Sequence, residues 1–244
     1  MSTVIWHDLE CGRYEQDLSL WLGLAAERAG NGQPVLDVGS GSGRVSIPLA
    51  RAGHSVVALD RDPDLLVEVE RRGAGLPVET VRADAREFSL PGRAFPLIVA
   101  PMQTLQLLGG AAGHVAFFER AAAHLLPGGV VAVAIASADD FEEFEWHEGD
   151  ASPMPDIAEF DSDAYFSQPT AVRREGYVFV LERRREAVDG HGGRTTSTDR
   201  TELDIVTVQG VQEAGQRAGL HPLTVRQIPA TSEHIGSQVV ILGA

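Results

Sequence analysis

The stretch VLDVGSGSGRVSIPLA, residues 35–50, decides the fold. Its first four residues, 35–38, form a short apolar run of the kind found in a strand that is buried on both faces. Three glycines follow at alternate positions, and a helix is expected from Arg44 onwards. Strand, glycine turn and helix together open a nucleotide-binding βαβ unit, because glycine lets the backbone turn sharply and approach a ligand closely.

The spacing of the glycines discriminates between ligands. A dinucleotide fingerprint requires G-x-G-x-x-G/A, and its third small residue would fall on Arg44 or Ser46, neither of which fits well. The turn instead has the pattern D-x-G-x-G-x-G, beginning at Asp37. A second expected strand, 55–59, is followed by Asp60, about twenty residues past the turn, where such folds place an acid on ribose hydroxyls.

This turn, together with the acid after the next strand, resembles the first motif of class I S-adenosylmethionine-dependent methyltransferases, specifically those that act on small molecules. The resemblance covers residues 35–137 and includes the LLPGG segment at 125–129. It implies an α/β fold with a doubly wound, Rossmann-like sheet of seven strands, mostly parallel with an antiparallel last strand. It also implies S-adenosyl-L-methionine as cofactor and methyl transfer as the reaction.

The resemblance places cofactor contacts on the glycine turn and on the ends of neighbouring strands. It implies that Asp37 orders the turn and reaches the amino group of the cofactor, and that Asp60 accepts from both ribose hydroxyls. It implies further that Arg61 covers one adenine face and that Asp84 accepts from the adenine amino group. The other expected contacts are Tyr14, Gly39, Ser40, Gly41, Gly43, Ala83, Ala85, Ala100 and Gln103.

Two residues are candidates for a role in the chemistry. Residues 8–29 are expected to form one or two amphipathic helices, and the resemblance places Tyr14 near the methionine end of the cofactor. Residues 139–163 hold eleven Asp or Glu and no Lys or Arg, interleaved with aromatic residues, and we expect them to form a lid over the acceptor. His147 in that loop is the candidate general base, because imidazole titrates near neutral pH. His234 is interpreted as a residue of a connecting loop.

Several observations favour a small-molecule acceptor with a nucleophilic nitrogen or oxygen. Residues 100–103 read Ala-Pro-Met-Gln where nucleic-acid and protein N-methyltransferases often carry Asn/Asp-Pro-Pro-aromatic. The net charge of −15 disfavours a nucleic-acid partner. Two alternatives stay open: an enzyme of cyclisation or elimination that keeps the bound cofactor, and a regulatory protein with a degenerate cofactor site.

We expect one methyltransferase domain over 1–244, with a cofactor-binding core at 35–137, an insertion covering the acceptor at 138–207, and a final helix and strands at 208–244. Within the insertion, 171–188 and 195–206 alternate as strands do, and the glycine-rich turn between them predicts an antiparallel hairpin.

The cysteine count and the lengths of the apolar runs limit the bonds, the metal sites and the cellular location that this protein can have. The single cysteine, Cys11, excludes an intrachain disulfide and a cysteine-based zinc site, and no metal is expected. No apolar run reaches ~18 residues, so we expect a cytoplasmic protein without membrane contact. The sequence leaves open whether the protein is a monomer or a homodimer.

Overall fold

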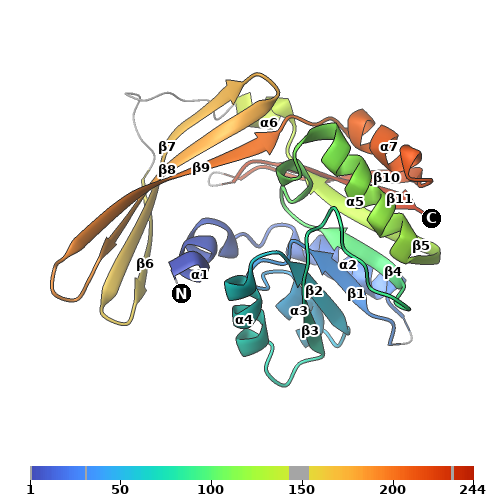
Figure 1. The fold of residues 1–244 in the computed structure, drawn as a ribbon, viewed down its shortest axis with the longest axis horizontal. Helices are drawn as coiled ribbons and strands as arrows, with labels where there is room; N and C mark the ends of the chain where they lie inside the picture. Colours follow the sequence, from blue (N-terminus) through green and yellow to red (C-terminus); the bar gives the residue numbers. More distant parts are fainter. Residues whose placement is uncertain (1, 31, 143–153, 232–233) are drawn as a thin grey trace.

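The computed structural model describes residues 2–30, 32–142, 154–231 and 234–244, and in it the chain forms two sheets. The larger sheet has seven strands in the order β10-β11-β5-β4-β1-β2-β3, and the smaller has four in the order β6-β7-β8-β9. Figure 1 shows the smaller sheet projecting from one end of the larger one. The strands of the larger sheet are β1 (Val35–Val38), β2 (Val56–Asp60), β3 (Val78–Arg82), β4 (Phe95–Ala100), β5 (Leu125–Ile135), β10 (His221–Ile228) and β11 (Ser237–Gly243).

Parallel pairing joins β1 to β5 through β4, and β1 to β3 through β2, whereas β11 is antiparallel to both of its neighbours. This confirms the expected fold class, a doubly wound sheet with an antiparallel last strand. The five strands β1 to β5 therefore end at one edge, called the carboxyl edge below. Because β11 runs the opposite way, its start lies at that same edge, where Gln238 pairs with Ile135 at the end of β5.

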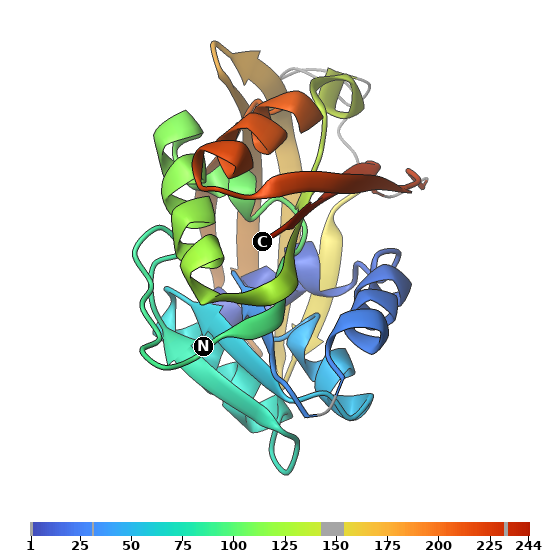
Figure 2. The ribbon, with the colours of Figure 1, turned by 90° about the vertical axis from the view of Figure 1, so that its right-hand side faces the viewer.

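Helices cover both faces of the larger sheet. One apolar cluster joins α5 (Gly110–His124) and α7 (Val208–Arg217) to one face, as Figure 2 shows. A second cluster joins α2 (Leu18–Arg28) and α3 (Ser46–Arg51) to the other. The further helices are α4 (Pro63–Arg72), the short 3-10 helix η2 (Leu105–Leu107) and α6 (Ala138–Glu142). No helix within the described ranges is long and apolar enough to cross a membrane.

Some expected boundaries in the larger sheet were wrong. The first helix after the glycine turn begins at Ser46 rather than Arg44. The strand β5 begins at Leu125, directly after the helix that ends at His124. The LLPGG segment therefore lies within the strand, where the register of the pairing between β4 and β5 shifts.

The N-terminal region is more broken than a pair of helices over 8–29. It forms α1 (Ser2–His7), the π-helical turn η1 (Asp8–Gly12) and then α2. Trp21, Leu24 and Ala25 of α2 are buried against the sheet, so the predicted apolar stripe is correct although the boundaries are not.

The insertion forms a sheet of four antiparallel strands rather than one hairpin. Its strands are β6 (Asp156–Phe160), β7 (Asp163–Glu175), β8 (Val178–Val188) and β9 (Arg194–Asp204). The stretch 171–188 folds back on itself at Gly176, whose φ of 62° is a left-handed value that glycine adopts without a steric penalty. The acidic stretch 139–163 contains α6 and β6, and its residues 143–153 lie outside the described residues.

The smaller sheet is joined to the larger one near the end of β5. Phe141 and Phe179 stack with ring centroids 4.7 Å apart, in a buried cluster with Ala136 and Leu203. The buried Gln106 side chain accepts from Ala136 N–H (2.8 Å) and donates to the carbonyls of Ala136 (3.2 Å) and Asp204 (2.8 Å). These contacts fix the end of β9 beside the carboxyl edge.

Candidate functional site

The glycine turn lies at the carboxyl edge directly after β1. Gly39, Gly41 and Gly43 have φ values of 71°, 55° and 94°, all in the region that favours glycine. The N–H groups of Gly39 and Ser40 donate to the Leu59 carbonyl at 2.8 and 3.0 Å, which ties the turn to β2. Residue types other than glycine would strain this backbone, so the spacing of the motif follows from its geometry.

Asp60 joins the ends of three strands. Its Oδ2 accepts from Gly41 N–H at 2.8 Å, and its Oδ1 accepts from Asp62 N–H at 2.9 Å. Its backbone carbonyl accepts from Ala83 N–H at 3.0 Å, at the end of β3. An ionised carboxylate has about four acceptor positions, so each oxygen of Asp60 retains capacity for a ligand hydroxyl.

Asp37 is buried in β1, beneath the turn. Its Oδ2 accepts from the Ser46 hydroxyl at 2.6 Å, but its Oδ1 has no hydrogen-bond partner among the described residues. Burial raises the pKa of Asp37 to about 6, although the Ser46 hydroxyl and the Arg44 charge lower it. The hydroxyl of Ser40, also buried, likewise has no partner in the described part of the chain. The turn therefore presents two shielded polar atoms to a ligand.

The residues expected around an adenine ring lie after β2 and β3. Arg86 holds Asp84 with two guanidinium bonds of 2.9 and 2.7 Å and with its backbone N–H at 2.8 Å. These bonds lower the pKa of Asp84 to about 2, so its carboxylate is ionised at neutral pH. Ala83 and Ala85 pack against the apolar core on either side of Asp84, and Arg61 is exposed.

The loop after β4 lies against the glycine turn. Ala100 is fully buried at the end of β4, and Met102 has a φ of 53°, which is uncommon for a residue other than glycine. The backbone carbonyl of Gln103 accepts from Gln106 N–H at 2.9 Å. A Cβ placed on Gly39 would lie 2.5 Å from the Thr104 methyl group, so only glycine permits this close approach.

The N-terminal segment, α1 with η1, covers the glycine turn from the other side. A Cβ placed on Gly41 would lie 2.3 Å from His7 Nε2. The Ser42 hydroxyl donates to Asp8 at 2.5 Å, and Arg72 at the end of α4 forms an ion pair with the same carboxylate.

The same segment also contacts the smaller sheet. Glu10 of η1 accepts from the Ser167 hydroxyl at 2.6 Å and from the Arg185 guanidinium at 2.7 and 2.6 Å. The Trp6 ring meets the edge of the Tyr165 ring, with centroids 5.4 Å apart. The N-terminal segment therefore bridges the glycine turn and the smaller sheet.

Tyr14 is buried in the segment between η1 and α2, and Arg44 holds it near the glycine turn. The Arg44 guanidinium lies 5.2 Å from the centre of the Tyr14 ring and donates to the Tyr14 carbonyl at 2.9 Å. It also forms a buried bidentate ion pair with Asp17, at 2.5 and 2.8 Å. Sequence reasoning missed this pair, because the two residues are 27 positions apart and no periodicity links them. The other predicted catalytic residue, His147, lies outside the described residues.

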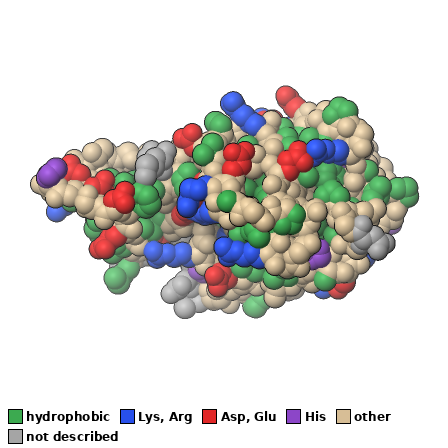
Figure 3. All heavy atoms as spheres, turned by 90° about the horizontal axis from the view of Figure 1, so that it is seen from below, with side chains coloured by type: hydrophobic (Ala, Val, Ile, Leu, Met, Phe, Trp, Pro, Cys, Tyr) green, Lys and Arg blue, Asp and Glu red, His purple; other side chains and the backbone are tan. Residues whose placement is uncertain are grey.

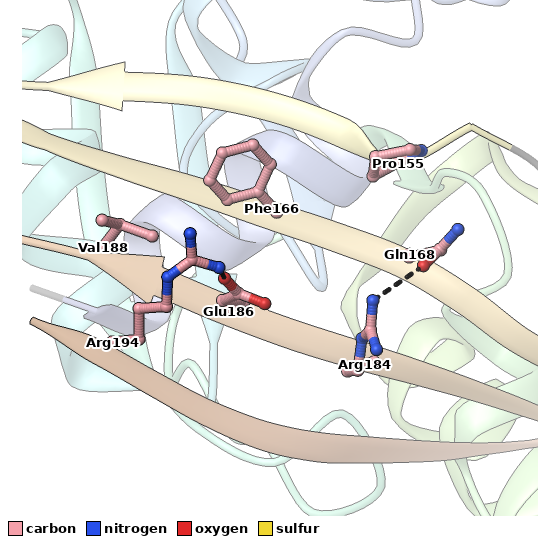
Figure 4. Close-up of a pocket in the computed structure, with 7 residues that line it drawn as sticks. All are labelled: Pro155, Phe166, Gln168, Arg184, Glu186, Val188 and Arg194. Atoms are coloured by element: carbon pink, nitrogen blue, oxygen red, sulfur yellow. Dashed lines mark hydrogen bonds and ion pairs between the residues drawn. The ribbon is translucent and has the colours of Figure 1, made fainter. Parts of the chain in front are cut away.

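A separate groove of about 310 Å³ lies on the opposite face of the smaller sheet from Glu10. Phe166 and two polar pairs, Arg184 with Gln168 and Glu186 with Arg194, line it, as Figure 4 shows. On the molecular face in Figure 3, arginine side chains alternate with acidic and apolar ones. Among the described residues, no group of three or more His, Cys, Asp or Glu is placed to hold a metal ion.

Comparisons with known proteins agree with this geometry. Residues 35–129 match the family model described as a methyltransferase domain, so the match begins at β1 and contains the glycine turn, Asp60 and Asp84. Residues 35–129 therefore carry a methyltransferase domain, in agreement with the predicted class I S-adenosylmethionine-dependent methyltransferase superfamily. The predicted family is thereby confirmed, and with it the family's cofactor, S-adenosylmethionine.

Curated relatives share part of the sequence. A cypemycin N-terminal methyltransferase from a Streptomyces species is 30% identical over 145 residues, which are 59% of this chain and 58% of that protein. A dTDP-3-amino-3,6-dideoxy-alpha-D-glucopyranose N,N-dimethyltransferase from Streptomyces fradiae is 36% identical over 99 residues, 41% of this chain and 38% of that protein. The matches thus span less than two thirds of these relatives.

Solved structures share the fold over nearly the whole chain. An amino pentose methyltransferase from Micromonospora echinaspora, solved with S-adenosylmethionine bound, has a TM-score of 0.73 at 20% identity and covers 98% of this chain and 96% of its own. A sugar N-methyltransferase from Streptoalloteichus has a TM-score of 0.75 at 18% identity, and the match covers 99% of this chain and 92% of that one. The shared fold therefore includes the smaller sheet.

The contact between His7 and Gly41 gives a stability prediction for this methyltransferase domain. Gly41→Ala introduces both a left-handed alanine, which costs about 1–2 kcal/mol, and a clash with the His7 ring. Gly53→Ala is the matched control, because Gly53 has a φ of 93° but nothing within 4 Å of its added Cβ. We expect a larger loss of unfolding free energy in urea for Gly41→Ala than for Gly53→Ala.

The double variant His7→Ala/Gly41→Ala separates the clash from the backbone strain. The double-mutant cycle should show a coupling of about 0.5–3 kcal/mol, the range for residues in contact. Additive effects of the two substitutions would show that His7 does not contact the turn in solution.

Proposed function

We propose that this protein transfers a methyl group from S-adenosylmethionine to an amine nitrogen of a small molecule. The observation that carries the proposal is the buried Asp37 carboxylate, whose Oδ1 has no partner among the described residues although it lies beneath a glycine turn. A buried carboxylate oxygen without a partner is costly, and a cationic ligand group would supply the missing hydrogen bond.

The residues around the turn fit this cofactor. Asp37 would face its α-ammonium group, and Asp60 has acceptor capacity for its ribose hydroxyls. Asp84, held ionised by Arg86, would accept from its adenine amino group. The side chains of Thr104 and His7 approach Gly39 and Gly41 in the space that a Cβ would fill, so these two side chains border the turn.

The protein contributes orientation and exclusion of water rather than covalent chemistry. S-adenosylmethionine, when bound, supplies an electrophilic methyl group on a sulfonium sulfur. The loop after β4, with Met102 and Gln103, would position the acceptor at the carboxyl edge. The N-terminal segment would shield that edge from water. Orientation of this kind can lower a barrier by about 7–11 kcal/mol.

Two features support an amine acceptor of small size. The names of both relatives described above specify a methyltransferase acting at an amino group or an N-terminus. Arg183 and Arg185, on the face of the smaller sheet that meets η1, are paired with Asp156, Asp199 and Glu10, which leaves that face with balanced charge. We propose that residues 138–207 cover the acceptor, as an insertion within one domain.

A methyl-transfer assay tests the proposal. We would incubate the protein with S-adenosylmethionine and either dTDP-3-amino-3,6-dideoxyglucose or a short peptide with a free α-amine, and follow the products by mass spectrometry. We expect a gain of one or two methyl groups on the amine of one acceptor. Matched analogues with a hydroxyl group in place of the amine are the controls.

The outcomes separate the alternatives. Methylation of the hydroxyl analogues alone would replace the amine with an oxygen acceptor. A changed acceptor without an added methyl group would favour a cyclisation or elimination enzyme. Cofactor binding without any product across a broad amine panel would favour a regulatory protein.

The raised pKa of Asp37 gives a pH prediction. The folded-state value of about 6 lies above the ordinary value of 3.8, so Asp37 is protonated in the ligand-free protein at pH 5 and ionised at pH 7. An ammonium group favours the ionised form, so binding below pH 6 must release a proton. Affinity for S-adenosylhomocysteine should therefore be about tenfold lower at pH 5 than at pH 7, as measured by calorimetry.

Asp37→Asn is the control for that measurement. The amide has no charge to titrate, so its affinity should be weaker at pH 7 and nearly flat between pH 5 and 7. An equal fall in both proteins would assign the pH dependence to another group, and a flat wild-type profile would contradict contact between Asp37 and the ammonium.

A further inference from the structure

The loop between β10 and β11 places a histidine at the carboxyl edge. The loop returns to the sheet at Ser237, next to Gln238, which pairs with the last residue of β5. A Cβ placed on Gly236 would lie 3.4 Å from Asp140 Oδ1, so the loop also lies against α6. Figure 1 shows β10 ending and β11 beginning on the side of the larger sheet that faces the smaller one. His234 in this loop is therefore near the region where we place the acceptor.

The His234 ring rests on Tyr14. The two ring centroids are 5.0 Å apart with an interplanar angle of 49°. The Tyr14 hydroxyl hydrogen-bonds the side chain of Ser237, and the Arg44 guanidinium lies against the Tyr14 ring. Within the described ranges, the charged or titratable groups that these contacts place around His234 are Tyr14, Arg44 beyond it, and Asp140 of α6 beside the loop.

The loop holds the backbone of His234 in place while the ring retains an unused nitrogen. The Thr231 N–H donates to the His234 carbonyl at 2.8 Å, and the His234 N–H donates to the Thr231 hydroxyl at 3.0 Å. The Nδ1 atom is shielded from solvent and has no hydrogen-bond partner among the described residues. It is one of three such side-chain atoms in the described part of the chain, and the other two, on Asp37 and Ser40, belong to the glycine turn.

A shielded imidazole nitrogen without a partner is suited to accept a proton from a ligand, because imidazole titrates near neutral pH. Aliphatic amines are mostly protonated at that pH, and an ammonium nitrogen has no lone pair with which to attack a methyl group. The reaction proposed above therefore requires removal of a proton first.

We propose that His234 accepts this proton through Nδ1, in the tautomer that carries its hydrogen on Nε2. The N–H bond of the acceptor's ammonium breaks, the Nδ1–H bond forms, and the electron pair left on the amine nitrogen becomes the nucleophile. Once the methylated product has left, water that enters the vacated site takes the proton from the imidazolium and restores the neutral ring. This inference rests on the proposed function and gives a role to a residue that the sequence analysis interpreted only as part of a connecting loop.

Two substitutions separate proton transfer from packing. His234→Phe keeps a ring against Tyr14 but removes both nitrogens, and His234→Asn keeps a hydrogen-bond acceptor near the position of Nδ1 but cannot take a proton at neutral pH. We expect kcat with the amine acceptor identified for the wild type to fall by about 10²–10⁴-fold in both. His191→Asn, in the exposed β8–β9 turn, is the matched control and should leave kcat unchanged.

A binding measurement provides a readout that does not depend on turnover. In the complex with S-adenosylhomocysteine, the affinity of wild type for the amine acceptor should fall as pH drops through the imidazole range, because imidazolium repels ammonium. His234→Asn should lose that dependence while its affinity at pH 8 changes by less than about threefold. Unchanged affinity for S-adenosylhomocysteine would verify that the variants fold.

The outcomes distinguish this inference from the function on which it rests. If the wild type methylates the amine and His234→Phe does so at the same rate, His234 contributes only packing. Full activity in His234→Asn would limit it to a hydrogen-bonding role. Both results would overturn proton transfer while leaving methyl transfer intact. A wild type that binds cofactor but methylates no amine would overturn the proposed function, and the inference with it.

Discussion

The buried carboxylate of Asp37 is the constraint on which the site depends. It lies on the third residue of β1, on the face of the sheet that α2 and α3 cover, where water cannot solvate it. Within the described residues it has one hydrogen-bond partner, the Ser46 hydroxyl, so a ligand group that reaches its other oxygen would complete its hydrogen bonding. The left-handed glycines above it carry no side chains of their own, and the Thr104 and His7 side chains pack against Gly39 and Gly41.

The rest of the edge is organised by hydrogen bonds that cross between strands. Asp60 connects the glycine turn, the start of α4 and the end of β3 through three backbone N–H groups. Two residues of the N-terminal segment extend these connections: Asp8 binds Ser42 in the turn, and Glu10 binds Arg185 in the smaller sheet. Because Asp8 and Glu10 are two positions apart, a movement of the smaller sheet would also act on the glycine turn.

Sequence reasoning predicted the parts of this molecule that follow from local patterns. The alternating glycines after an apolar run predicted β1 and its turn. The two acids further along the chain, Asp60 and Asp84, lie at or just after the ends of the next two strands, and parallel strands end at the same edge of a sheet. It mistook 171–188 for one strand, because Gly176 interrupts an otherwise alternating pattern by only one residue. The ion pair of Arg44 with Asp17 and the contact of His234 with Tyr14 were not predictable, since they join residues far apart in the chain through tertiary packing.

The central claim is that the glycine turn and Asp37 bind a sulfonium cofactor with an ammonium group rather than a dinucleotide. Calorimetric titration of the purified protein, freed of carried-over ligand, tests it most directly. We predict micromolar binding of S-adenosylmethionine and S-adenosylhomocysteine, no binding of NAD, and a clear loss of affinity for both sulfur ligands in Asp60→Ala. Binding of NAD alone, or sulfur-ligand affinity that Asp60→Ala leaves unchanged, would contradict the account.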